Sequence, residues 1–238
     1  MAAVSPVVDR EIEAALVVVS SDPADVLARL RELRRVEPYG LEPRSEQRLL
    51  DRYLDTPSGA LWDRRLALRE RWVDGECELA LKGQLGPRER LEIAGPQGGA
   101  TWRRIEAALR AREIRVPSSA WRVIQERSMR RERRAMTSED WTLAELDLDD
   151  VAYRFGTRTV RFFEVEIELE DIGADLDALV RAVQRAVPEL REWPYDKLVT
   201  GAAMAIGLDK DQLRVSARGA LLPESLEQLG CRLAAGQT

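Results

Sequence analysis

Three glutamates at every second position give residues 160–169 the clearest chemical character in the chain. Side chains alternate between the two faces of a β-strand, so Glu164, Glu166 and Glu168 would share one face. The apolar residues between them would share the other face. We therefore predict a strand that carries a ladder of carboxylates on one side and contributes to a packed core on the other.

The same alternation of charged and apolar residues recurs in other segments, with charges of both signs. A sheet built from such strands is either open to water on its charged face or closed around a charged interior. The further alternating charges are Glu11 and Glu13; Arg69 and Arg71; Glu78 and Lys82; Arg88, Arg90 and Glu92; and Glu145, Asp147 and Asp149.

Composition excludes several kinds of chemistry. The 238 residues include 37 basic and 42 acidic ones, a formal net charge of -5, which argues against a general nucleic-acid binder. There is no histidine in the sequence, so Ser-His and Cys-His nucleophilic catalysis and histidine metal ligands are excluded. A metal in this protein must be held by oxygen, which favours magnesium, manganese or calcium over zinc.

Cysteine usage and hydropathy bear on location. Cys77 and Cys231 lie far apart and form neither a disulfide framework nor a metal-ligand spacing. The sequence shows no signal peptide and no long apolar run. We therefore expect a cytoplasmic protein with no membrane partner.

Eight strands could present the alternating charges. The dipeptide Asp74-Gly75 favours a two-residue hairpin, and the glycine-rich residues 95–100 suggest a linker. The arginine-rich stretch before residue 136 is compatible with a helix or a strand, and we choose a strand because two further strands follow at hairpin distance. The predicted strands are 7–19, 45–54, 66–73, 77–82, 88–93, 127–136, 141–151 and 160–170.

Helices are predicted between and after these strands. Ser21 or Asp22 is the expected cap of a first helix with Pro23 in its first turn, and Thr101 is the expected cap of a later helix. The predicted helices are 23–33, 58–63, 101–112, 174–186, 196–207 and 222–233.

Short turns between most of the strands favour an antiparallel sheet. We predict an α+β fold in which eight antiparallel strands close into a β-barrel, or tunnel, with helices packed outside. Residues 1–207 would form this domain and residues 208–238 a helical tail. The tail could cap a mouth of the tunnel or mediate a homodimer, and the sequence does not choose between these roles.

A charged interior needs compensation. Two carboxylates about 5 Å apart repel by roughly 3 kcal/mol at an effective dielectric near 20, so the acids require cations. Interior arginines alone could form a structural charge lattice, but buried ion pairs are weak sources of stability. We favour acids that hold a divalent metal and arginines that hold a polyanion, because phosphoryl transfer depends on positioning and charge stabilisation.

Several short motifs follow one another in a fixed order along the chain. They are Glu11-Ile12-Glu13, Tyr53-Leu54-Asp55-Thr56-Pro57, Leu68-Arg69-Glu70-Arg71, Leu79-Ala80-Leu81-Lys82-Gly83, Arg90-Leu91-Glu92, Leu148-Asp149-Asp150-Val151, Glu164-Val165-Glu166 and Asp196-Lys197. This order resembles that of CYTH domains, the triphosphate tunnel metalloenzymes, which include inorganic triphosphatases, thiamine triphosphatases and class IV adenylate cyclases. The resemblance covers about residues 7–207.

The resemblance implies a magnesium- or manganese-dependent phosphohydrolase with a small-molecule triphosphate as its partner. Inorganic tripolyphosphate is the first expected substrate, ahead of a nucleoside or thiamine triphosphate. By resemblance, Glu13 and Glu166 are the catalytic residues, and the metal ligands are Glu11, Glu13, Asp149, Glu164 and Glu166. The substrate-binding residues implied in the same way are Arg69, Arg71, Lys82, Arg90, Arg131, Arg133 and Lys197.

One position departs from the family pattern. Ala15 stands where the opening Glu-x-Glu-x-Lys motif has its lysine, which in the family is expected to contact the substrate and is a candidate for activating water. Two alternatives to the hydrolase therefore stay open. One is a polyphosphate- or nucleotide-binding module with little catalysis, and the other is a class IV-type adenylate cyclase.

Overall fold

The computed structural model describes residues 9–86, 88–114, 120–139 and 141–236. The chain divides into two compact units. The first unit comprises Met1–Glu11 and Leu49–Glu126, and the second comprises Ile12–Arg48 and Arg127–Thr238. None of the helices in the described part of the chain has the length and apolar character needed to span a membrane.

The strands form one antiparallel hydrogen-bonded order that closes on itself. The order is β10-β1-β6-β5-β4-β3-β7-β8-β9, β1 also pairs with β9, and the short β2 pairs with β3. Eight of these strands, β1 and β3–β9, make up the closed order, so the eight-stranded antiparallel barrel of the α+β class that the sequence predicts is confirmed. The strands are β1 Asp9–Val18, β2 Arg35–Val36, β3 Tyr39–Asp55, β4 Leu66–Val73, β5 Glu76–Gln84, β6 Glu89–Pro96, β7 Arg122–Ser138, β8 Trp141–Phe155, β9 Arg158–Leu169 and β10 Leu190–Glu192.

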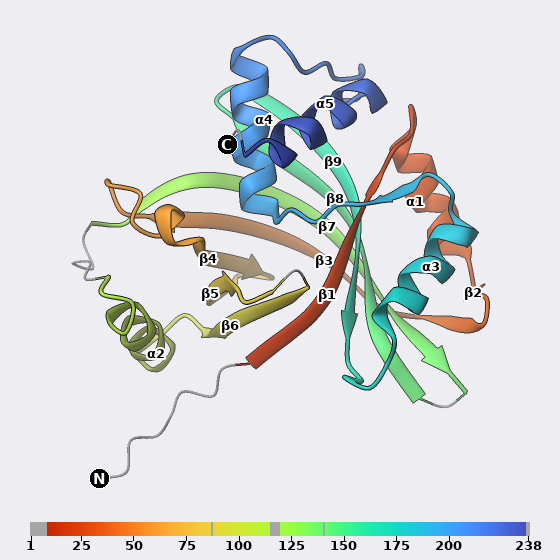
Figure 1. Cartoon of the computed structure of the whole chain (residues 1–238), viewed down its shortest axis with the longest axis horizontal. Coiled ribbons are helices and arrows are strands. Elements are labelled where there is room, and N and C mark those ends of the chain that lie inside the picture. Colours follow the sequence, from red (N-terminus) through yellow and green to blue (C-terminus); the bar gives the residue numbers. More distant parts are fainter. Residues whose placement is uncertain (1–8, 87, 115–119, 140, 237–238) are drawn as a thin grey trace. The chain divides into compact units, whose positions relative to one another are not determined.

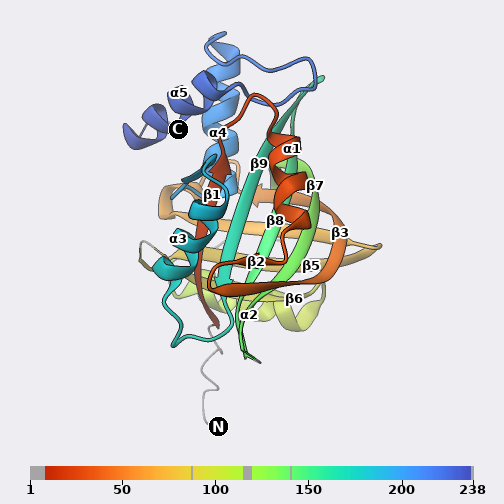
Figure 2. The same ribbon diagram turned by 90° about the vertical axis from the view of Figure 1, so that its right-hand side faces the viewer.

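In the second unit, helices α1 (Pro23–Glu32) and α3 (Leu176–Ala186) cover the outer face of β8 and β9. Figure 2 shows both helices against these strands. Their apolar residues, spaced for one helix face, pack on the aliphatic residues that alternate with the acids of β8 and β9. The apolar half of each strand is thus used by the core, which leaves the acidic half on the opposite face.

Side-chain caps fix where these two helices begin. The Asp22 carboxylate accepts a hydrogen bond from the Asp25 amide at 3.4 Å, and Pro23 occupies the first turn of α1, as the sequence predicts. The Asp175 carboxylate accepts from the Ala178 amide at 3.0 Å and caps α3 in the same way.

In the first unit, helix α2 (Gly99–Arg110) packs on β5 and β6 (Figure 1). Ile105, Leu109 and their neighbours on α2 meet buried leucines of β4 and β5 in a second core. The buried Asp55 at the end of β3 accepts hydrogen bonds from the amides of Thr56, Leu61 and Trp62 at 2.6, 2.9 and 2.9 Å. These bonds fold the following turn around Asp55.

Two further helices follow β10 in the second unit. Helix α4 (Lys197–Asp209) is capped by Asp196, whose carboxylate accepts from the Val199 amide at 2.8 Å. Helix α5 (Pro223–Ala234) packs on α4. The connecting segment touches β9, because the Arg161 amide donates to the Gly219 carbonyl at 2.8 Å. The domain boundary after residue 207 that the sequence suggested stays a prediction.

The hairpin between β4 and β5 supports a stability prediction. Asp74 and Gly75 have φ values of 50° and 88°, the left-handed pair that a two-residue turn of this kind requires. We expect Gly75→Ala to lower the unfolding free energy by about 1 kcal/mol, measured by urea denaturation, because alanine disfavours this backbone conformation. The control Gly99→Ala, in the first turn of α2, should leave the stability unchanged or raise it. Equal losses in both variants would contradict this explanation.

Several expected boundaries are wrong, each for a physical reason. The helix over 58–63 is only a 3-10 turn, η1 (Trp62–Arg64), because Asp55 takes the amides of Leu61 and Trp62. Gly98, not Thr101, is the N-cap of α2, and the Thr101 side chain is buried against Gly95. Residues 95–100 are therefore no linker, since β6 and α2 use most of them.

The other differences concern strands. β3 and β7 are each 17 residues long and begin before the expected residues 45 and 127. The short strands β2 and β10 were not predicted.

Candidate functional site

Strand register brings the acids of the second unit together. Glu164 of β9 lies opposite Asp149 of β8, and Glu166 lies opposite Asp147. On the other side of β8, Arg131 of β7 lies opposite Asp149. Residues opposite each other in a sheet share a face, so these side chains point the same way.

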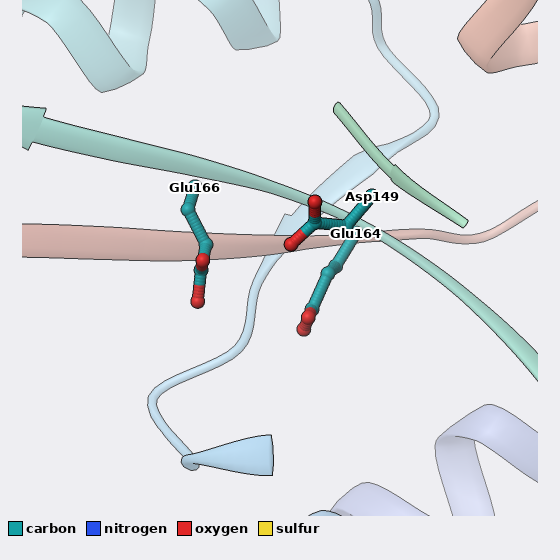
Figure 3. Close-up of side chains that lie close together, drawn as sticks. All are labelled: Asp149, Glu164 and Glu166. Atoms are coloured by element: carbon teal, nitrogen blue, oxygen red, sulfur yellow. The ribbon is translucent and has the colours of Figure 1, made fainter. Parts of the chain in front are cut away.

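Three of these carboxylates form a compact group, which we call the acid trio: Asp149, Glu164 and Glu166. One oxygen from each lies within 4.8 Å of the others. Asp149 and Glu164 are buried and Glu166 is half-buried. Figure 3 shows the three carboxylates gathered from β8 and β9. Among the described residues, this is the group of three carboxylates whose oxygens lie close enough to hold one metal ion.

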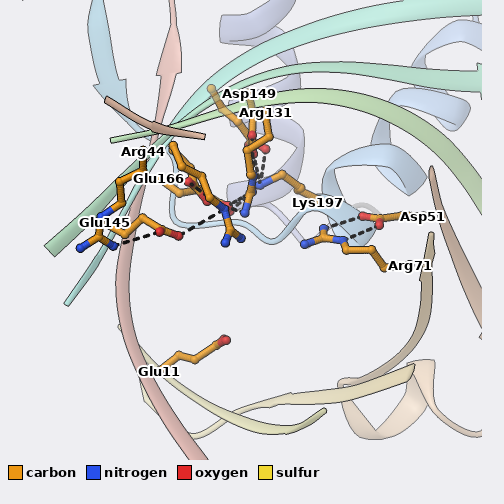
Figure 4. Close-up of polar contacts among 12 residues, drawn as sticks. Glu11, Arg44, Asp51, Arg71, Arg131, Glu145, Asp149, Glu166 and Lys197 are labelled. Atoms are coloured by element: carbon orange, nitrogen blue, oxygen red, sulfur yellow. Dashed lines mark hydrogen bonds and ion pairs between the residues drawn. The ribbon is translucent and has the colours of Figure 1, made fainter. Parts of the chain in front are cut away.

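Two basic side chains contact the acid trio (Figure 4). The Lys197 ammonium forms ion pairs with Glu164 and Glu166 and lies 3.3 Å from an Asp149 oxygen. The Arg131 guanidinium donates to Asp149 at 2.8 and 2.5 Å and to Glu166 at 2.6 Å. Both cations are more than nine-tenths buried. Arg131 also pairs with Asp147, so one guanidinium links three acids.

Burial and charge shift the pKa values within this group. Burial raises the pKa of Glu164 to about 7, although Lys197 opposes the shift. Burial also raises the pKa of Asp147 to about 7, although Arg131 opposes it. Burial alone would lower the pKa of Lys197, but Glu164, Glu166 and Asp149 raise it above its ordinary value. The basic side chains present thus compensate the buried negative charge only in part.

The acid trio fits an oxygen-preferring divalent ion. Its ligands are carboxylates alone, the donor type that magnesium and manganese prefer, and their oxygens are already close. Asp149, Glu164 and Glu166 would hold the ion, and Lys197 and Arg131 now occupy the space around the same oxygens.

The first unit carries a separate set of paired charges. The Arg71 guanidinium donates to the fully buried Asp51 at 2.7 and 2.8 Å in a two-pronged contact (Figure 4). The Lys82 ammonium donates to Glu11 at 2.8 Å and lies 3.2 Å from Glu92. The buried Arg69 lies 3.9 Å from Glu92. These cations share one face of the sheet, because Lys82 of β5 lies opposite Ala67 of β4, and Arg69 and Arg71 follow Ala67 at every second position.

The remaining predicted site residues are placed by their strands. Arg90 of β6 is half-buried and lies opposite Gln84 of β5. Arg133 of β7 is half-exposed and lies 3.4 Å from Glu145. The buried Glu13 lies opposite Glu168, outside the acid trio. Glu11 lies in the first unit with Lys82.

Sequence reasoning missed two acids that hold predicted cations. Asp51 alternates with Tyr53 and Asp55 along β3, a period-two signal that places it on the buried face. Asp147 alternates with Asp149 and was noted as charged but not included among the expected ligands. Asp51 lies directly opposite Arg71 in the sheet, and Asp147 forms an ion pair with Arg131 although its partner in the register is Arg133.

Ala15, which stands where the family motif has its lysine, lies next to the acid trio in the β1–β9 register. It lies directly opposite Glu166 across the β1–β9 pair, so its methyl group stands beside an acid of the trio. A lysine at this position would bring a further ammonium to Glu166.

Comparisons with known proteins agree with this architecture. The CYTH domain family model matches residues 17–194. A search of curated proteins finds no match. The chain is similar in structure to HpAC1 from Hippeastrum, described as a proposed adenylyl cyclase with a dominant triphosphatase activity. The TM-score is 0.60 at 17% identity, over 82% of this chain and 96% of that one.

Two microbial structures are similar as well. One is a Bacillus halodurans protein described as a proposed adenylate cyclase, with a TM-score of 0.55 at 17% identity over 79% of this chain and 95% of that one. The other is PH1819 from Pyrococcus horikoshii, with a TM-score of 0.51 at 17% identity over 83% of this chain and 99% of that one. At these identities, the likeness concerns the fold.

Proposed function

Because this chain belongs to the CYTH domain family, we propose that it is a divalent-metal-dependent phosphohydrolase that acts on a triphosphate, with inorganic tripolyphosphate as the first substrate. The observation that carries the proposal is the acid trio, three carboxylates within 4.8 Å of one another in contact with a buried lysine and a buried arginine. The triphosphatase activity described for HpAC1, which shares the fold, supports the same reaction class.

In this proposal the acid trio is the metal site. Magnesium or manganese would supply positive charge against the phosphate oxygens and polarise the phosphorus centre that is attacked. The chain's own part is to hold the three carboxylates in register on β8 and β9 and to exclude bulk water from Asp149 and Glu164. Glu166, half-buried and the most exposed of the three, is our candidate for orienting the attacking water.

Phosphate binding falls to the basic side chains. Lys197, Arg131 and Arg133 would contribute from the second unit, and Arg69, Arg71, Lys82 and Arg90 remain our proposal for the first. In the described structure, Arg71, Lys82, Arg131 and Lys197 are paired with carboxylates. An incoming polyanion would exchange some of these ion pairs for charge-assisted hydrogen bonds to phosphate oxygens, which guanidinium and ammonium groups make well.

The test is orthophosphate release from tripolyphosphate, with ATP alongside, in magnesium, in manganese and in chelator. We expect metal-dependent release that is faster from tripolyphosphate than from ATP, and formation of cyclic AMP from ATP would instead indicate the cyclase alternative. We also expect tripolyphosphate with metal to raise the melting temperature, because a ligand that binds only the folded state stabilises it. A protein that releases no phosphate and keeps its melting temperature unchanged would refute the proposal.

A binding module is the second candidate, and the position of Ala15 favours it. With a methyl group opposite Glu166, the site lacks the ammonium that the family motif supplies there. If the chain binds tripolyphosphate without turnover, Ala15→Lys should create phosphate release at least about ten-fold above the background. If the wild-type protein is an active hydrolase, Ala15→Lys should change its rate by less than that.

The control for this substitution is Ala14→Lys, which places the charge one residue earlier on the opposite, buried apolar face of β1. It should lower stability and create no activity. Equal gains of activity in both variants would contradict the claim that a lysine opposite Glu166 is what restores turnover.

A further inference from the structure

We propose that Tyr153 is a positioning residue for Lys197: its hydroxyl holds the start of α4 so that the Lys197 ammonium stays on the acid trio and competes there with a divalent ion. The inference rests on the proposed function in one respect, since it takes the trio as the metal site. It adds that the Lys197 ammonium is a built-in cation at that site and that Tyr153 keeps this ammonium in place.

Lys197 occupies the place that a metal would take. Its ammonium contacts Glu164 and Glu166 and lies 3.3 Å from Asp149, so it touches every member of the trio. The residue is only 7% exposed. A buried ammonium and a divalent ion that bind the same three carboxylates weaken each other's binding, because their like charges repel at short range in a poorly solvated site.

The hydroxyl of Tyr153 determines where the Lys197 side chain leaves the backbone. It donates a hydrogen bond of 3.0 Å to the Lys197 carbonyl, and Tyr153 is fully buried. Lys197 is the first residue of α4, directly after the cap Asp196. Helix ends are the parts of a helix most prone to fraying, so a bond at this carbonyl restrains the residue that bears the ammonium.

Aromatic packing keeps Tyr153 itself rigid. Its ring stacks on Phe155 with centroids 6.3 Å apart and meets the edge of Phe162 at 6.4 Å. The Arg127 guanidinium lies over the same ring, 5.9 Å from its centroid. Phe162 continues the cluster to Trp193, at 5.5 Å. A ring held on several sides presents its hydroxyl in one direction.

The cluster also makes a second bond to the first turn of α4. The Trp193 indole donates to the Thr200 hydroxyl at 2.9 Å, and both groups are buried. Thr200 follows Lys197 by three residues and therefore lies one turn along the same side of the helix. The start of α4 is thus fastened at two points to the packed aromatic side chains.

Strand β8 carries both Asp149, which Lys197 contacts, and Tyr153, which bonds to the Lys197 carbonyl. Asp149 and Tyr153 lie on β8, four residues apart and on the same face, which corresponds to about 13 Å along a strand. β8 pairs with β7 on one side and β9 on the other, so this spacing is fixed by the sheet. Lys197 therefore contacts two parts of one strand, because its carbonyl accepts from Tyr153 and its ammonium lies 3.3 Å from Asp149.

The experiment measures manganese affinity by titration calorimetry at pH 8 on the full chain, without substrate, for wild type, Tyr153→Phe, Lys197→Met and the double variant. Tyr153→Phe removes one hydroxyl and keeps the ring. We expect Lys197→Met to tighten manganese binding by about five-fold or more, because the competing ammonium is gone. Tyr153→Phe should tighten it in the same direction, and adding it to Lys197→Met should change nothing further.

The matched control is Tyr195→Phe, a tyrosine of the same aromatic cluster that meets Trp193 at 5.3 Å. It should bind manganese as wild type does, and circular dichroism should show all variants folded. Unchanged affinity in Lys197→Met or in Tyr153→Phe, or a tightening by Tyr153→Phe that persists in the Lys197→Met background, would overturn the inference alone. If none of the proteins binds manganese, the inference and the metal site of the proposed function both fail.

Discussion

Glu166→Gln should abolish metal-dependent phosphate release, with a fall in kcat/KM of at least about 100-fold. The substitution keeps the size of the side chain and removes the charge of a trio member that, like Asp149, contacts both Arg131 and Lys197. The divalent ion would lack one carboxylate ligand, and Arg131 and Lys197 would lose a charged partner that they share. Release of orthophosphate from tripolyphosphate in manganese measures it.

The matched control is Asp150→Asn on β8. Asp150 pairs with Arg161, its Oδ1 accepting from the guanidinium at 3.0 Å, and alternation puts it on the face opposite to Asp149. It therefore makes the same carboxylate-to-amide change beside the trio without touching it, and activity should stay within a factor of about three. Equal losses in Glu166→Gln and Asp150→Asn would show that the effect is general and does not arise at the trio.

The largest effect on stability should come from Arg134→Met. Arg134 is fully buried on the outer face of β7, and its guanidinium donates to the carbonyls of Leu30, Arg31, Leu33 and Leu41 at 3.0, 2.6, 2.8 and 3.2 Å. Three of these carbonyls, those of Leu30, Arg31 and Leu33, belong to the last turn of α1 or to its C-cap, and of these the Leu30 carbonyl also accepts the Leu33 amide at 3.3 Å. Burial lowers the pKa of Arg134, and the nearby charges of Glu132 and Glu32 oppose the shift.

Methionine fills much of the same space without a donor, so the carbonyls of this buried site would lose their partner. We expect a loss of roughly 3–5 kcal/mol in unfolding free energy, measured by urea denaturation. Arg130→Met is the control: Arg130 lies four residues earlier on β7, is exposed, and pairs with Glu46 at 2.7 Å. Its removal should cost less than about 1 kcal/mol. Similar losses for the two arginines would contradict a capping role for Arg134.

Local alternation explains why much of the site could be predicted from the sequence. Glu164 and Glu166 share a face because the period of a strand is two, and no distant contact is needed to know it. The same rule places Arg69 with Arg71 and Arg131 with Arg133. The strand formed by the arginine-rich stretch is confirmed in β7, where Arg131 faces the acids and Arg134 faces the core.

Partner choice across strands could not be read in this way. Asp149 lies opposite Glu164 only because β8 and β9 pair in one particular register. The register of the β7–β8 pair shifts between Met136 and Thr137, and no sequence pattern predicts this shift. Lys197 reaches the trio through the docking of a helix, so only family resemblance pointed to it. The capping role of Arg134 depends on where α1 ends in space, which no sequence spacing encodes.

Local capping rules also failed where tertiary contacts competed with them. Thr101 has the side chain of a helix cap, yet it is buried against the backbone of Gly95, where a Cβ would lie 2.7 Å from its hydroxyl. The helix consequently begins two residues earlier, at Gly99. Packing against β6 outweighs the roughly 1 kcal/mol that a side-chain cap contributes.

The most direct test of the central claim is orthophosphate release from tripolyphosphate by the wild-type protein in manganese, followed by addition of excess chelator in the same assay. We predict steady release that stops on chelation and resumes when manganese is restored, with Glu166→Gln inactive throughout. Release that continues unchanged in chelator, or equal release by Glu166→Gln, would contradict a metal-dependent triphosphatase built on Asp149, Glu164 and Glu166.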